Sequence, residues 1–356
     1  MQFQKLLLLL GSTVLIGLLQ PVSAQGFEGY YRYPTVHQGQ IVFTAEGDLW
    51  KVPLEGGLAA RLTSHLEEET HPHISPDGKT IAFRAAYEGS VDLYTMPIDG
   101  GLPERWTFGS ESPIPSGWTP DGKVLYATRY YSTLPEYQLV QLDLGTKQRT
   151  RVPLYQASEG SYREDGKTVF FVRPADHRNV TKRYLGGTAR KIWKYSDGAD
   201  EAIRLSDDYA GESHHPMWWQ GRVYFITDRD GTMNIWSMTE SGEDLEQHTE
   251  HQEFDVRYAT LSEGQIVYQR GADIWHLDLN SGAYAVVPIT IVSDLDQRRE
   301  KWESNPGQYL TSAHLHPAGK QVVLTARGRV FVAPVKSGRM VQLSRESGVR
   351  FRDATF

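Results

Sequence analysis

The stretch ISPDGKTIAFRAAYEGSVDLYTMPIDGG, residues 74–101, contains a turn, an apolar strand, a second strand and a second turn in close succession. In the first turn, Ser-Pro-Asp-Gly, the proline presets the backbone, the aspartate tolerates the bridge region and the glycine takes the left-handed position. A turn of this kind reverses the chain into an antiparallel hairpin. The stretch therefore predicts two paired strands, around residues 81–83 and 92–94.

The same unit recurs along most of the chain. Asp77, Asp121 and Asp165 hold the same turn position at intervals of 44 residues. Weaker copies of the turn contain Gly39, Gly221, Gly264 and Gly319. An apolar strand follows each turn, at residues 41–43, 81–83, 124–126, 169–171, 223–225, 266–268 and 322–324. Because the aspartates recur at one turn position, we interpret them as turn residues and not as catalytic carboxylates.

A repeat of about 40–45 residues with three or four strands is typical of a β-propeller blade. We therefore predict an all-β protein with a six-bladed β-propeller over residues 30–291, a linker over residues 292–306, and the truncated first blade of a second propeller over residues 307–356. The polar, proline-terminated linker separates the sixth copy from the seventh. The alternative is a single seven-bladed ring made of all seven copies.

The last residues of the chain, 349–356, align with the apolar strand that precedes each turn. We expect them to form the inner strand of an eighth blade, cut just before its turn. A natural domain seldom ends with an unpaired apolar strand. The pattern therefore indicates that the chain is a fragment of a longer protein.

The composition excludes some partners and bonds. The chain is mildly acidic, with 37 basic and 44 acidic residues, and has no basic stripe that would bind a phosphate backbone. Nucleic acid is therefore not an expected partner. The chain has no cysteine, which removes disulfides. We expect no cofactor.

Residues 1–24 have the pattern of a cleavable signal peptide. Lys5 supplies a short positive region, residues 6–19 an apolar region, and Val22-Ser23-Ala24 a small-residue cleavage site. The apolar run is short for a bilayer span, which disfavours a membrane anchor. We expect cleavage after Ala24, a periplasmic or secreted mature protein, and no membrane anchor after cleavage.

Two segments give the chain a resemblance to a known family. Residues 183–193 read RYLGGTARKIW, and residues 221–231 read GRVYFITDRDG. Together with the order of six blades, they resemble the N-terminal part of tricorn proteases. Members of that family are large serine proteases in which a six-bladed and a seven-bladed propeller precede a helical, a PDZ-like and a catalytic domain. The resemblance implies that residues 307–356 begin a seven-bladed propeller.

Catalytic residues are not assigned in this chain. The family's catalytic histidine and serine lie downstream of both propellers, and no residue here matches their motifs. No Gly-x-Ser-x-Gly elbow follows a strand, and the repeats leave no room for a hydrolase domain. The parent family is a serine-type peptidase, so whether this chain acts as part of an enzyme stays open.

Candidate channel or rim residues come from an insertion in the fourth blade and from histidines at blade starts. The insertion is locally basic, which is typical of a solvated loop but would also attract peptide carboxylates. The histidine runs 71–73, 214–215 and 314–316 suggest metal ligation, yet no cysteine or acidic cluster accompanies them, so we favour channel-lining or packed histidines and expect no metal. The candidates are Arg178, Lys182, Arg183, Arg190, His73 and His314.

Our leading hypothesis is that the chain is the exported N-terminal propeller region of a tricorn-like serine peptidase. It would gate and channel peptides for proteolysis by downstream domains. The expected partners are peptide substrates, the downstream protease domains of the same polypeptide and, as an open alternative, further copies of the chain. The alternative function is a TolB-like periplasmic propeller that binds proteins without catalysis.

Overall fold

The computed structural model describes residues 29–109, 111–174, 182–295, 303–346 and 348–356. Over these residues the elements are β-strands, apart from the 3-10 helix η2 (Pro306–Tyr309). They form two compact units, one reaching residue 295 and the other starting at residue 303. The signal peptide predicted for residues 1–24 and the candidate Arg178 lie outside the described residues. Within the described part of the chain, no helix has the length and apolar character that a membrane crossing requires.

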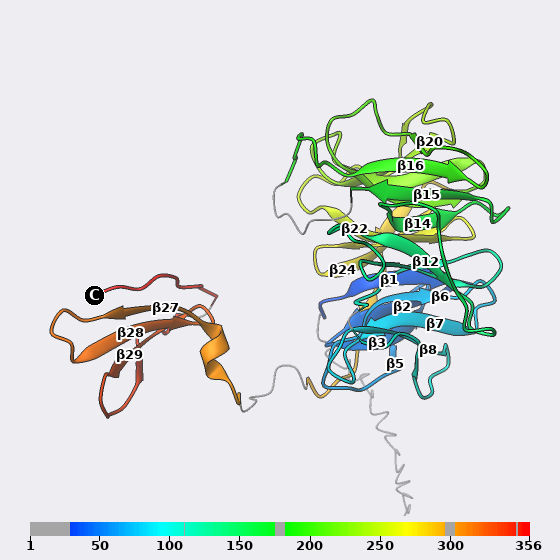
Figure 1. Ribbon diagram of the computed structural model, residues 1–356. Coiled ribbons are helices and arrows are strands. Elements are labelled where there is room, and N and C mark those ends of the chain that lie inside the picture. Colours follow the sequence, from blue (N-terminus) through cyan, green and yellow to red (C-terminus); the bar gives the residue numbers. More distant parts are fainter. Residues whose placement is uncertain (1–28, 110, 175–181, 296–302, 347) are drawn as a thin grey trace, which may run out of the picture. The chain divides into compact units, whose positions relative to one another are not determined.

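Six four-stranded antiparallel sheets, which we call blades one to six in chain order, make up the first unit (Figure 1). The first strands of the blades are β1 (Arg32–His37), β6 (Thr70–Ile74), β10 (Ile114–Trp118), β14 (Ser158–Tyr162), β18 (Ser213–Trp219) and β22 (Val256–Ser262). The second strands are β2 (Gln40–Ala45), β7 (Thr80–Ala85), β11 (Val124–Thr128), β15 (Thr168–Arg173), β19 (Arg222–Thr227) and β23 (Gln265–Arg270). The third strands are β3 (Asp48–Pro53), β8 (Asp92–Pro97), β12 (Gln138–Leu142), β16 (Lys191–Ser196), β20 (Asn234–Thr239) and β24 (Asp273–Asp278). The fourth strands are β5 (Ala60–Arg61), β9 (Glu104–Arg105), β13 (Arg149–Arg151), β17 (Ile203–Arg204), β21 (Glu246–Gln247) and β25 (Tyr284–Val286).

The first strands form a ring. Each packs against the first strands of its two neighbouring blades, and β22 packs against β1. Apolar residues fill the layers between blades, as where Val42 and Leu49 of blade one pack against Phe83 of blade two. These layers bury the alternate side chains that a single blade would leave exposed to water. The prediction of an all-β, six-bladed propeller is confirmed.

The Ser-Pro-Asp-Gly turn of residues 75–78 is stabilised by hydrogen bonds to its aspartate, Asp77. One carboxylate oxygen of Asp77 accepts hydrogen bonds from the Ser75 hydroxyl at 2.6 Å and from the Lys79 backbone N–H at 3.1 Å. Gly78 has a φ of 74°, the left-handed region that favours glycine. The Ser75 hydrogen bond is the main cause that lowers the pKa of Asp77. The interpretation of Asp77 as a turn residue is confirmed.

The ring closes with the same hydrogen bond that links consecutive blades. Where the chain enters blade six, the N–H of Val256 donates to the carbonyl of Met233 in blade five at 2.9 Å. The N–H of Tyr31, before β1, donates to the carbonyl of Ala272 in blade six, also at 2.9 Å. Blade one therefore follows blade six in space as blade six follows blade five.

The segment that follows blade six runs back along blade one and covers the contact between these two blades. Strand β26 (Ile289–Thr290) pairs in parallel with β4 (Gly57–Leu58) of blade one. Val287 and Ile291, on either side of β26, are buried in a core cluster with residues of blades one and six, including Val267. Because six blades close the ring, the alternative of one seven-bladed ring is wrong.

The second unit is a single four-stranded antiparallel sheet. Its strands are β27 (Leu310–Leu315), β28 (Gln321–Ala326), β29 (Arg329–Pro334) and β30 (Val341–Gln342), paired in that order. This is the strand order of blades one to six, so the sheet is a further propeller blade.

The segment after this blade differs from the sequence prediction. Residues 349–356 begin as the chain does where it passes from one blade to the next. The N–H of Phe351 donates to the carbonyl of Gly328 at 2.9 Å, as the N–H of Val256 does to the carbonyl of Met233. Residues 349–356 have no regular secondary structure, however, and the predicted inner strand of an eighth blade is not formed. A strand needs a partner to complete its backbone hydrogen bonds, and no described strand pairs with this segment.

Candidate functional site: the channel of the first propeller

A cavity of about 1110 Å3, which we call the channel, lies inside the ring of first strands. Residues from the first strands of all six blades line it, and so do Lys182 and Arg183 of the blade-four insertion. Since the walls come from equivalent strands, equivalent positions in the repeat face the same space.

In all six first strands, a β-bulge shifts the pairing with the second strand. In five of them the bulged residue carries a side chain and has a positive φ, and these residues are Tyr33 (52°), His71 (53°), Glu159 (50°), His215 (52°) and Tyr258 (50°). Side-chain-bearing residues rarely take such a φ, and a bulge redirects the side chain that it carries. In β10 of blade three, the shift lies between Pro115 and Gly117, and the glycine takes the positive φ.

The five bulged side chains meet in the channel, and we call them the bulge collar. The ring of Tyr33 lies 4.2 Å from that of His71 and 4.4 Å from that of Tyr258. Tyr258 also lies 5.9 Å from His215 and 5.8 Å from His71, which belongs to a blade that is not its neighbour. Glu159 accepts a hydrogen bond from the N–H of His215 at 2.8 Å. The collar therefore narrows the channel at one level.

Burial and neighbouring charged groups together set the protonation of several groups in the channel wall. Burial lowers the pKa of His71 well below its usual value and that of His73 to about 4, so both imidazoles are neutral at pH 7. Burial alone would favour the neutral form of Glu159, but the effects of His215 and Arg190 outweigh it and lower the pKa of this carboxyl well below its usual value. Glu159 is therefore ionised.

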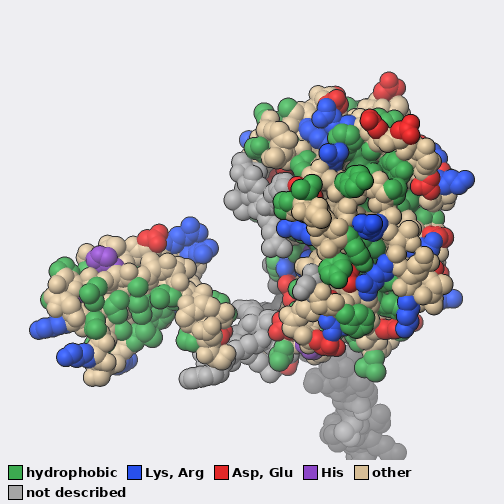
Figure 2. Space-filling view, viewed as in Figure 1, with side chains coloured by type: hydrophobic (Ala, Val, Ile, Leu, Met, Phe, Trp, Pro, Cys, Tyr) green, Lys and Arg blue, Asp and Glu red, His purple; other side chains and the backbone are tan. Residues whose placement is uncertain are grey.

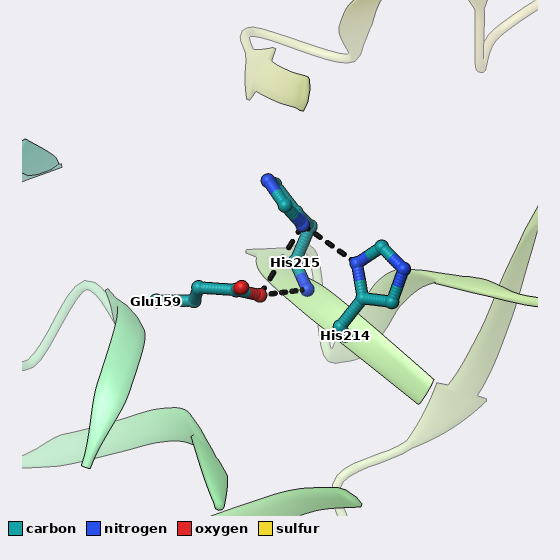
Figure 3. A group of neighbouring side chains, drawn as sticks. All are labelled: Glu159, His214 and His215. Carbon is teal, nitrogen blue, oxygen red and sulfur yellow. Dashed lines mark hydrogen bonds and ion pairs between the residues drawn. The ribbon is translucent and has the colours of Figure 1, made fainter. Parts of the chain in front are cut away.

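Glu159, His214 and His215 bring three ligand-type atoms together (Figure 3). Nδ1 of His215 lies 2.7 Å from Nδ1 of His214 and 3.2 Å from a carboxylate oxygen of Glu159. The sequence shows no acidic cluster beside the histidine runs, but the fold brings one carboxylate, that of Glu159, to His214 and His215. Glu159 belongs to blade four and the histidines to blade five, so the contact forms only when the blades pack side by side.

Three predicted basic residues of the blade-four insertion line the channel. Nζ of Lys182 lies 2.6 Å from a carboxylate oxygen of Asp255, and Nη2 of Arg190 lies 2.7 Å from one of Glu212. The Nε–H of Arg183 donates a hydrogen bond to the backbone carbonyl of Gly231 at 2.7 Å. Carboxylates therefore neutralise part of the positive charge that these residues of the blade-four insertion bring to the channel.

The two predicted histidines lie in different units. His73 lines the channel of the first unit. His314 lies on β27 of the second unit, where its Nδ1 accepts a hydrogen bond from the N–H of Phe356 at 3.4 Å. The structure therefore places Lys182, Arg183, Arg190 and His73 around one cavity and His314 elsewhere.

The collar tyrosines and Glu159 were missed as site residues. A signal for them exists, because each bulged residue precedes the glycine of its blade's first turn by six or seven residues. Tyr33 before Gly39 and Glu159 before Gly166 are examples. The residue types differ at this position, so a search for repeated residues passes over it.

Fold and site together define a six-bladed β-propeller with a central channel lined by polar and apolar side chains. The model of the tricorn protease N-terminal β-propeller domain matches residues 28–283. The chain belongs to the tricorn protease family, and the resemblance inferred from its sequence is confirmed.

Individual relatives agree with this assignment. Tricorn protease homolog 1 of Streptomyces coelicolor is 31% identical over 341 residues, covering 95% of this chain and 31% of the relative. A crystal structure of the tricorn protease superposes with a TM-score of 0.73 at 22% identity, covering 90% of this chain and 32% of the other. A TolB-like protein of Agrobacterium tumefaciens gives a TM-score of 0.51 at 18% identity, over 62% of this chain and 80% of the other. The two structures share the fold, and this chain spans about a third of the length of the tricorn relatives.

Proposed function

We propose that this chain is the substrate-handling region of a tricorn-like serine peptidase, in which the channel guides peptides to or from catalytic domains elsewhere in the protein. Membership of the family supports the peptidase role over a TolB-like binding role. The bulge collar carries the proposal. Its side chains project into the channel and contact one another from blade to blade, and Tyr258 of blade six reaches His71 of blade two. An extended peptide would pass this level only when they move, and the collar would then act as a gate.

The chemistry of the channel suits a peptide better than a highly charged polymer. Tyrosine and histidine rings offer apolar faces for side chains, and their polar atoms offer hydrogen bonds to a peptide backbone. The paired charges at Lys182 and Arg190 leave no strong field of one sign. On the face shown in Figure 2, basic and acidic side chains of the first unit are interspersed rather than gathered in one patch.

Protection of single cysteines from alkylation tests whether peptides occupy the channel. The chain has no cysteine of its own, so Tyr258→Cys places one thiol in the collar. Thr150→Cys places one on the exposed part of β13 as a matched control. We expect a short flexible peptide to slow maleimide labelling several-fold at position 258 and not at position 150. Equal labelling rates with and without peptide at both positions would overturn the proposal.

We also propose that the protein is exported and that its leader is removed after Ala24. The charged, apolar and small-residue regions of residues 1–24 support this. N-terminal sequencing of the protein recovered from the cell envelope fraction should begin at Gln25. Recovery of a chain with an intact leader from the cytoplasm would contradict the proposed compartment without affecting the proposed channel.

A further inference from the structure

We propose that Glu159, His214 and His215 form a binding site for one divalent transition-metal ion of the zinc class in the wall of the channel. The three side chains each offer one ligand atom, and these atoms lie within 4.8 Å of one another. Two imidazole nitrogens and one carboxylate oxygen are a donor set that zinc binds. The site departs from the sequence expectation of no metal.

The β-bulge explains how two neighbouring histidines face the same point. Successive side chains of a regular strand point to opposite faces, so adjacent histidines would normally be separated. In β18 the pairing with β19 shifts between His214 and Met217, and His215 takes a φ of 52°. As a result the two Nδ1 atoms lie only 2.7 Å apart (Figure 3).

Two of the three distances between the ligand atoms are close to those of a tetrahedral site, and the third is at most 4.8 Å. Zinc binds nitrogen and oxygen at about 2.0–2.2 Å, which places neighbouring tetrahedral ligand atoms about 3.3 Å apart. The His215 Nδ1 to Glu159 oxygen distance of 3.2 Å already matches this value. The His214 Nδ1 to His215 Nδ1 distance of 2.7 Å needs to open slightly, by a small rotation of one ring.

Arg190 is the positive charge that could oppose a metal ion here. Its Nη1 lies 3.5 Å from the other carboxylate oxygen of Glu159, Oε1, while Oε2 faces His215. Nη2 of Arg190 lies 2.7 Å from Glu212, whose carboxylate offsets the guanidinium charge. Arg190 thereby orients Glu159 toward the histidines and leaves one oxygen for the metal.

Three protein ligands leave at least one coordination position of a tetrahedral ion for another molecule. Glu159, His214 and His215 all line the channel, so that position faces the channel space. Water or a donor group of a bound peptide, such as its amine or carboxylate, would occupy it. The metal proposal can be tested separately from the proposed peptide gate, because ion binding is measured in the absence of peptide. Either proposal can therefore fail without the other.

The test is titration of the EDTA-treated full chain with ZnCl2 by isothermal calorimetry, with Co2+ absorption spectra as a second measurement. We expect one ion per chain. Glu159→Gln, which keeps the shape and a hydrogen-bond acceptor for the His215 N–H, and His215→Ala should each weaken binding at least tenfold. Circular dichroism in EDTA checks that both variants remain folded, and the Co2+ spectrum of the native chain should show tetrahedral coordination.

Other histidines provide the controls. His314 lies on β27 of the second unit, and His316 follows directly after the end of that strand. A chain with both changed to alanine, and a His73→Gln chain, should bind zinc as the native chain does. The proposal is overturned if the native chain binds no ion, if Glu159→Gln and His215→Ala bind as tightly as the native chain, or if the His314/His316 double variant loses the site.

Discussion

Glu69 is a fully buried carboxyl group at the junction of blades one and two. It accepts hydrogen bonds from the hydroxyls of Thr63 and Tyr87, each at 2.7 Å. Burial is the main cause that raises the pKa of Glu69 from 4.5 to about 7, against the opposing effect of these hydrogen bonds. The group therefore titrates close to neutral pH in the folded protein.

This shift predicts a pH dependence of stability. Between the unfolded and folded pKa values, the folded protein binds a proton that the unfolded chain has released, so stability falls as the pH rises through this window. Glu69→Gln removes the titration. Urea unfolding at about pH 5 and about pH 8 should show the native chain losing more unfolding free energy than Glu69→Gln. Exposed Glu104→Gln is the control, and an equal loss in the native and Glu69→Gln chains would contradict the prediction.

Within a blade, one hydroxyl ties the end of the fourth strand back to the third. A backbone N–H in the third strand donates to a Ser or Thr hydroxyl 14 residues later, at 2.8 to 3.0 Å. The pairs are Leu49 with Thr63, Leu93 with Thr107, Ile192 with Ser206, Ile235 with Thr249 and Val330 with Ser344. The last pair shows that the blade of the second unit is built in the same way.

Thr107 is the clearest place to test this tie. Its hydroxyl accepts from the N–H of Leu93 and donates to Asp92 at 2.8 Å, and the residue is fully buried. Thr107→Val keeps the shape of the side chain but removes the hydroxyl that binds the Leu93 N–H and the Asp92 carboxylate. We therefore expect a loss of about 1–3 kcal/mol in unfolding free energy. Urea unfolding measures it. Exposed Thr150→Val should change stability by less than about 0.5 kcal/mol, and a similar effect of both changes would refute the tie.

The blades could be predicted from sequence because their signals are local. The turn of Asp77 and the strand after it lie within a few residues of each other, and repetition amplified that signal. The collar and the Glu159 cluster could not be predicted in the same way, because their contacts join different blades. Residues 349–356 were mispredicted because their pattern matches a strand, whereas a strand also needs a partner for its backbone hydrogen bonds, and no described strand pairs with them.

At the scale of the whole ring, the return of the chain at β26 is a point of closure. Ile291 is 2% exposed and packs in the cluster that joins blades six and one. Ile291→Ala should cost about 2–5 kcal/mol by loss of packing. It should also speed amide hydrogen exchange in β1 and β23 together, since both flank the closure. Exposed Val292→Ala is the control, and fast exchange in only one of the two strands would argue against a closed ring.

The second unit should be the less protected part of the described chain. Five of the six residues of β27 are exposed, and its core is restricted to a few positions such as Val323 and Thr325. Amides with few buried neighbours open locally at low free energy. Hydrogen exchange should therefore be faster across β27–β29 than across β1–β3. Equal protection in the two units would contradict this expectation.

The positive-φ bulge shared by five first strands separates the shape of the channel wall from its chemistry. The bulged residue has a similar positive φ whether it is Tyr33, His71 or Glu159, so the same backbone conformation accommodates different side chains. Each of these five blades therefore places a different side chain at an equivalent position of the channel wall. Substitutions at this position can therefore change the chemistry of the channel wall one residue at a time, without altering the strands that form the ring.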